Sequence, residues 1–225
     1  MIPVPILLVL VAIEGWSENG AEWNYSLLRK VLENIPGVVL VVPSYLDAKG
    51  KLAKFKSHLT IEQYAAIVEK SIMDARKQYP GASVMVMGHS LGGLIARFLC
   101  AKGVFSPKNM ILVGTPNMGI SFGWLADGIL KILASKHLCN VPVFYQMLRE
   151  SDFLKMLNAN GIPEAYYISG LKDKVVPLWS SDPLNIGAYA ECGHKLFPRE
   201  EEFLDQSAIP IVKMIVTKKL EYLKC

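Results

Sequence analysis

The sequence predicts an α/β fold: a doubly wound, mostly parallel six-stranded sheet with a small helical cap inserted. Short apolar segments alternate with longer segments whose apolar residues recur at helical spacing, which favours parallel strands joined by helices. Hydrophobic residues make up 52% of the 225 residues and charged residues only 20%, enough apolar material for a large core. One connection is longer than the others, and we expect the cap there.

The six strands are predicted from short runs of Val, Ile, Leu and Met bounded by turn-forming residues. They are expected at residues 4–12, 38–42, 84–87, 110–113, 165–169 and 186–190. The main helices are expected at residues 23–34, 60–79, 91–102 and 210–223. Thr60 followed by Gln63 is a capping-box signature, and Gly103 is a stop signal.

Residues 117–160 interrupt this alternation. Their apolar residues recur at helical spacing, and the segment lies between the fourth and fifth strands. We therefore expect one domain, residues 1–225, with 117–160 as helices over the carboxyl edge of the sheet. For any single residue of this segment, ordinary core packing is the simpler interpretation.

Composition argues against several other classes of protein. The formal net charge is only +4, and the basic residues are not interleaved with aromatic residues, so we expect no nucleic-acid partner. The four cysteines lack Cys-x-x-Cys spacing, which predicts free thiols in a reducing compartment and no metal site. The apolar stretch 2–13 is too short for a membrane span. We expect a cytoplasmic protein, or a secreted one if a signal peptide has been removed.

The sequence Gly88-His89-Ser90-Leu91-Gly92 lies where the third strand passes into a helix. Gly-x-Ser-x-Gly between a strand and a helix is typical of a nucleophile elbow, in which a strained turn lifts the serine above the sheet. Glycine at both ends removes side chains that would collide as the strand and helix approach each other. Ser90 is therefore the predicted nucleophile.

A serine hydroxyl needs a base to accept its proton and an acid to hold that base. His194 follows the sixth strand and is the best candidate for the base. The side chain of His89 must point away from that of Ser90, its neighbour. His58 and His137 fall in a basic loop and in the expected cap.

The predicted acid is Asp173, which follows the fifth strand and gives the chain order Ser, Asp, His. Three competing carboxylates are Asp152 in the cap, Asp182 farther along the same loop, and Glu191 shortly before His194.

These residues make the chain similar to the α/β-hydrolase superfamily, and within it to small lipases and carboxylesterases. Residues 88–93 resemble the lipase elbow, and 114–119 are similar to the Gly-Thr-Pro-His-x-Gly stretch after the next strand. Residues 146–157 resemble a lipase lid. The resemblance covers essentially the whole chain, with two leading strands of larger members missing.

The resemblance implies an oxyanion hole made by the backbone N–H groups of Trp16 and Leu91. The family usually has His-Gly after the first strand, whereas this chain has Glu14-Gly15. A carboxylate about 4 Å from the oxyanion would oppose it by ~4 kcal/mol at an effective dielectric constant near 20. We therefore expect Glu14 to turn away into a salt bridge or a hydrogen-bond network.

The sequence thus predicts a serine hydrolase that cleaves small-molecule carboxylic esters of apolar acyl chains through an acyl-enzyme. No cofactor or metal is implied. Transient contact with lipid aggregates is compatible with the charge, and no particular oligomeric state is predicted. The alternatives are an acyl thioesterase, phospholipase or acyltransferase with the same triad, or a non-catalytic binding protein on a hydrolase scaffold.

Overall fold

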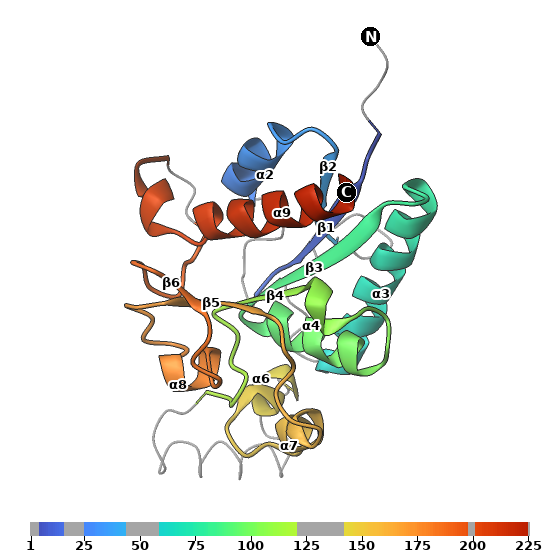
Figure 1. Ribbon diagram of the computed structural model, residues 1–225. Coiled ribbons are helices and arrows are strands. Elements are labelled where there is room, and N and C mark those ends of the chain that lie inside the picture. The colour runs from blue at the N-terminus through green and yellow to red at the C-terminus, as the bar shows by residue number, and fades with distance from the viewer. Residues whose placement is uncertain (1–4, 16–24, 44–58, 121–141, 198–200, 225) are drawn as a thin grey trace.

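The computed structural model describes residues 5–15, 25–43, 59–120, 142–197 and 201–224 (Figure 1). Within these ranges, six strands form one sheet in the order β2-β1-β3-β4-β5-β6, and all neighbouring strands are parallel. The strands are β1 (Leu8–Ile13), β2 (Val38–Val41), β3 (Ser83–His89), β4 (Met110–Val113), β5 (Tyr166–Gly170) and β6 (Ala188–Ala190). The predicted six-stranded parallel sheet is confirmed.

Helices cover both faces of the sheet. They are α2 (Ser26–Glu33), α3 (Ile61–Gln78), α4 (Leu91–Ala101), α6 (Pro142–Met147), α7 (Asp152–Asn158), α8 (Leu178–Ser181) and α9 (Ile209–Lys224), with 3-10 helices η1 (Pro107–Asn109) and η2 (Glu201–Gln206). In β1, alternate residues from Leu8 pack with α2 and α9, and those from Val9 pack with α3 and α4. Figure 1 shows the two helix pairs on opposite sides, so the sheet is doubly wound.

Among the first three strands, β1 and β3 differ most from their predicted bounds, and β2 ends one residue earlier than predicted, at Val41. β1 begins at Leu8, because Pro5 has no N–H to donate and the pairing with β2 starts only where Leu7 and Leu8 donate to the Gly37 carbonyl. β3 is longer than the predicted 84–87, since it continues through His89, which pairs with β4. The strand therefore ends directly before Ser90.

β6 is shorter than the predicted 186–190 and begins at Ala188. The Asp182 carboxylate accepts hydrogen bonds from the backbone N–H groups of Ile186 (3.1 Å) and Gly187 (2.8 Å). These two N–H groups are used in a turn, and neither residue belongs to the strand. The apolar side chain of Ile186 suggested a strand, but the local turn determines the backbone there.

The capping box predicted at the start of α3 is present. The Thr60 hydroxyl accepts from the Gln63 N–H at 3.3 Å, and the Gln63 side chain accepts from the Thr60 N–H at 2.9 Å. After the C-terminal end of α4, Gly103 has a φ of +77°, a conformation that favours glycine and ends the helix as predicted.

Of the predicted cap, residues 121–141 lie outside the described residues, and 142–160 contain α6 and α7. Gln146 joins α6 to the start of α3: its Oε1 accepts from the Ile61 N–H at 2.7 Å, and its Nε2 donates to Glu62 at 2.7 Å. The buried apolar residues of α6 and α7 belong to the same cluster as those of α3 and α4. The part of the cap that the structure describes therefore packs on the core, and its role as a cap stays a prediction.

Because the strands are parallel, their carboxyl ends meet at one edge. Five segments emerge there: Gly15 after β1, Ser90 after β3, Gly114 after β4, Asp173 after β5 and His194 after β6. Within the described ranges, no helix has the length and apolar character needed to cross a bilayer.

Candidate active site

Ser90 connects β3 to α4 in a strained backbone conformation. Its φ is 52° and its ψ is −121°, values that residues other than glycine rarely adopt. A Cβ on Gly88 would lie 2.3 Å from the Gly92 carbonyl oxygen, and a Cβ on Gly92 would lie 2.3 Å from the Ile13 carbonyl oxygen. Only glycine fits at both positions, and the strand and helix approach each other as the motif predicts.

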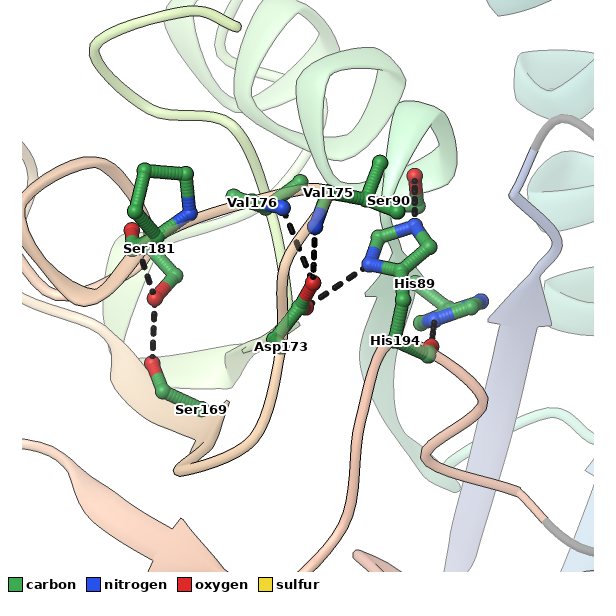
Figure 2. Close-up of polar contacts among 9 residues, drawn as sticks. His89, Ser90, Ser169, Asp173, Val175, Val176, Ser181 and His194 are labelled. Atoms are coloured by element: carbon green, nitrogen blue, oxygen red, sulfur yellow. Dashed lines mark hydrogen bonds and ion pairs between the residues drawn. The ribbon is translucent and has the colours of Figure 1, made fainter.

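His194 lies between Ser90 and Asp173 (Figure 2). Its Nε2 is 3.0 Å from Ser90 Oγ, and its Nδ1 is 2.8 Å from Asp173 Oδ2. An ionised carboxylate only accepts hydrogen bonds, so Nδ1 carries the proton and Nε2 is free to accept the Ser90 hydroxyl proton. The structure brings together three residues that are far apart in the sequence, in the geometry of a nucleophile, a base and an orienting acid.

The Asp173 carboxylate is held by its own loop. Its Oδ1 accepts from the backbone N–H groups of Val175 (2.8 Å) and Val176 (2.9 Å), leaving Oδ2 for His194. Burial alone would raise the pKa of the Asp173 carboxyl, but the hydrogen bonds from His194, Val176 and Val175 stabilise the ionised form, and the pKa lies below the ordinary value of 3.8. The carboxylate is therefore ionised and oriented toward the imidazole.

The three competing carboxylates lie elsewhere. Asp182 is 5% exposed, and its carboxylate binds backbone N–H groups and a tyrosine hydroxyl within residues 186–189. Glu191 forms a surface ion pair with Lys172 at 3.8 Å. Asp152 is in the first turn of α7. His194 Nδ1 donates its hydrogen bond to Asp173, and to none of these three carboxylates.

Two of the remaining histidines, His58 and His137, lie outside the described residues. His89 is at the end of β3, and its Nε2 is 2.9 Å from the backbone carbonyl oxygen of His194. As predicted, its side chain does not approach the Ser90 hydroxyl.

The predicted oxyanion donors are described only in part, because Trp16 lies outside the described residues. Leu91 is the first residue of α4 and is fully buried, so its N–H is at the helix N-terminus that begins beside Ser90. A Cβ on Gly15 would lie 2.9 Å from Ser90 Cβ, which means that the loop after β1 passes directly against the serine. Glu14 is buried, with 2% of its surface exposed, and the direction of its carboxylate stays a prediction.

Sequence reasoning missed Arg97, an arginine on the buried side of α4 that is 2% exposed. Its Nη1 donates to the Asn117 backbone oxygen (3.2 Å) and to Asn117 Oδ1 (3.3 Å), and its Nη2 donates to Asn158 Oδ1 (2.6 Å). Burial lowers the pKa of the guanidinium to about 10. The position of a charged residue among the apolar residues of this helix was the available sequence signal.

Asn117 extends this polar cluster toward the segment that follows Asp173. Its side-chain amide donates to the Ser181 backbone oxygen at 2.9 Å, and the Ser169 hydroxyl donates to the Ser181 hydroxyl at 2.7 Å (Figure 2). The helix after Ser90, the segment after β4 and the segment after Asp173 are therefore joined by buried hydrogen bonds. In the described ranges, no three His, Cys, Asp or Glu side chains are grouped so as to hold a metal ion, and Cys100 and Cys192 are free thiols.

No protein-family model and no curated protein matches the sequence, but several solved structures match the fold. The structure of LipS and LipT, described as metagenome-derived lipolytic enzymes, gives a TM-score of 0.65 at 13% identity, with 98% of this chain and 94% of that chain covered. The peroxisomal α/β-hydrolase Lpx1 of Saccharomyces cerevisiae gives a TM-score of 0.60 at 13% identity over 98% of this chain and 78% of the other.

Phospholipase PlaB of Legionella pneumophila gives a TM-score of 0.51 at 18% identity over 74% of this chain. This chain spans only 38% of the length of PlaB. These similarities agree with the six-stranded parallel sheet. The protein has the α/β-hydrolase fold.

Proposed function

We propose that the protein is a serine hydrolase that cleaves carboxylic esters of apolar acyl chains. The observation that carries the proposal is the continuous hydrogen-bonded line from Ser90 Oγ through His194 to Asp173, with distances of 3.0 and 2.8 Å. Ser90, Asp173 and His194 are the proposed catalytic residues. The similarity in fold to lipolytic enzymes and to a phospholipase supports a lipolytic reaction.

The proposed reaction begins when Ser90 Oγ attacks the ester carbonyl carbon and its proton passes to His194 Nε2. Asp173 stabilises the imidazolium that forms. When the tetrahedral intermediate collapses, the bond from carbon to the alcohol oxygen breaks, and His194 returns the proton to that oxygen. The alcohol leaves, and the acyl group remains bonded to Ser90.

Water then completes the proposed cycle. It attacks the acyl carbon while His194 takes one of its protons, and the second tetrahedral intermediate releases the carboxylic acid as the proton returns to Ser90 Oγ. The negative oxygen of both intermediates is proposed to be stabilised by the N–H groups of Leu91 and Trp16. Loss of one such donor typically reduces the rate by ~10²–10³.

A fluorophosphonate probe tests the proposed nucleophile, because it forms a covalent bond with an activated serine. We expect the wild-type protein to be labelled and the Ser90→Ala variant to stay unlabelled. Ser71→Ala is the matched control, since Ser71 lies on α3 and its hydroxyl donates to the Ile67 carbonyl of the same helix. A folded wild-type protein that the probe does not label would contradict the proposal and support the alternative, a binding protein on a hydrolase scaffold.

Turnover on a series of p-nitrophenyl esters tests the substrate class. If the acyl group binds an apolar site, kcat/KM rises from acetate toward medium-length chains. A higher kcat/KM on acyl-CoA than on any ester would instead support the thioesterase alternative, which uses the same three residues.

A further inference from the structure

His89 contacts the loop that carries His194, although it is the residue directly before Ser90. Its Nε2 lies 2.9 Å from the backbone carbonyl oxygen of His194 (Figure 2). A carbonyl oxygen only accepts hydrogen bonds, so Nε2 of His89 must carry a proton and donate it. This contact joins the end of β3 to the loop after β6, across 105 positions of sequence.

The same carbonyl oxygen accepts a second hydrogen bond, from the Leu196 N–H at 3.0 Å. Two donors that meet at one oxygen hold the peptide group of His194 in a single orientation. The Leu196 bond is local to the loop. The His89 bond is different, because it connects the loop to the strand that ends at Ser90.

Packing keeps the His89 ring in place. The Phe197 ring meets it edge to face at 5.7 Å between centroids, and the His194 ring lies 5.2 Å away. A Cβ on Gly15 would lie 3.0 Å from His89 Nδ1. The His89 imidazole therefore lies close to the Ser90 turn, to the loop that carries His194 and to the segment after β1.

We propose that His89 is a positioning residue: its Nε2–H holds the His194 backbone so that the His194 imidazole meets Ser90 Oγ. The proposal rests on the hydrolase function proposed above. The hydrogen-bond distance between a nucleophile and its base must be kept within a few tenths of an ångström. Changes outside the site that displace either residue therefore reduce turnover. A donor on β3 provides this alignment directly, because β3 also positions Ser90.

Three variants separate hydrogen bonding from packing. In His89→Gln, Nε2 is the same number of bonds from Cβ as in histidine and can still donate to the carbonyl. In His89→Met the side chain has similar length and no donor. In His89→Asn the amide is polar but too short, since its nitrogen occupies the place of the imidazole Nδ1.

The first readout is turnover of p-nitrophenyl butyrate across the pH range, with thermal unfolding to verify that each variant is folded. We expect His89→Met and His89→Asn to lower kcat about 3- to 10-fold, the effect of one neutral hydrogen bond, with KM unchanged. His89→Gln is expected to keep kcat within about twofold. Equal losses in the Gln and Met variants, or no loss in Met and Asn, would overturn the proposal.

The second readout does not depend on turnover. The proton shared by His194 Nδ1 and Asp173 gives a downfield proton NMR signal, which reports the alignment of the imidazole. We expect this signal in the wild type and in His89→Gln, and its broadening or loss in His89→Met and His89→Asn. Its persistence in all four proteins would contradict the positioning role. A wild type that gives the signal but no fluorophosphonate labelling would contradict only the hydrolase function.

Discussion

Asp173 and Asp182 both follow β5, and the carboxylate of Asp173 contacts His194 while that of Asp182 closes a turn before β6. The difference arises from the backbone around each residue. Val175 and Val176 donate to one oxygen of Asp173 and leave the other for the imidazole. Both oxygens of Asp182 accept backbone N–H groups from within residues 186–189.

The first prediction compares these two aspartates. Asp173→Asn is expected to lower kcat by about 10⁴-fold, because the amide disfavours the His194 tautomer that accepts the Ser90 proton. Asp182→Asn is expected to keep kcat within about threefold and to lower the free energy of unfolding by about 1–3 kcal/mol, since an amide nitrogen cannot accept from an N–H group. Ester hydrolysis and urea denaturation measure the two effects. A larger loss of kcat in Asp182→Asn than in Asp173→Asn would show that Asp182, and not Asp173, is the acid.

The second prediction concerns the close packing of Gly93 on Thr115. A Cβ on Gly93 would lie 1.8 Å from Thr115 Oγ1, so Gly93→Ala forces α4 and the segment after β4 apart. We expect it to reduce the free energy of unfolding by about 1–3 kcal/mol. In a Thr115→Gly background the same substitution should cost much less, because the colliding atoms are gone. Equal costs in both backgrounds, measured by urea denaturation, would show that this contact is not responsible.

The third prediction concerns Arg97, whose guanidinium joins α4 to α7. Arg97→Met removes the guanidinium that donates to Asn117 Oδ1 and Asn158 Oδ1, while the Asn117 backbone oxygen keeps the hydrogen bond from Asn158 Nδ2. We expect the free energy of unfolding to fall by roughly 3 kcal/mol. Lys77→Met is the matched control for loss of one positive charge, since Lys77 is exposed on α3. Chemical denaturation of both variants gives the comparison, and similar small losses in both would contradict a stabilising role for Arg97.

The fourth prediction concerns pH. Burial, followed by the nearby His194, lowers the pKa of His89 from the ordinary 6.5 to about 4. As the pH falls, the unfolded chain therefore binds a proton at His89 at a higher pH than the folded chain does. The contribution of His89 to the free energy of unfolding is thus fully present above pH 6.5 and is lost as the pH falls toward 4. His89→Gln removes this proton-binding group, so its stability should decline less between these two pH values. Parallel stability curves for the two proteins would contradict the lowered pKa.

The fifth prediction concerns Glu14, which is buried after β1. If its carboxylate turns away from the proposed oxyanion, Glu14→Ala changes kcat on a simple ester by less than tenfold. A hundredfold increase in kcat for Glu14→Ala would mean that the carboxylate faces the developing negative charge and opposes it. Steady-state hydrolysis of p-nitrophenyl acetate measures the difference.

Local patterns predicted most of the fold. The β4 prediction of residues 110–113 coincides with the observed strand, and the Thr60 capping box is present, because both features depend on neighbouring residues. The errors lie where a distant or irregular contact competes with the pattern. β6 starts late because Asp182 takes the N–H groups of Ile186 and Gly187.

The sequence by itself determined the strand–turn–helix around Ser90 and the position of Asp173 and His194 after parallel strands. Glycine at 88 is needed for a local steric reason, because a Cβ there would meet the Gly92 carbonyl oxygen four residues on, whereas glycine at 92 is needed because the Ile13 carbonyl oxygen of β1 lies against it. Only the tertiary structure decided which carboxylate meets the imidazole, and that His89 donates to the His194 backbone. Those contacts span large separations in the chain, and hydrogen bonds of about 3 Å depend on loop conformations that no local pattern specifies.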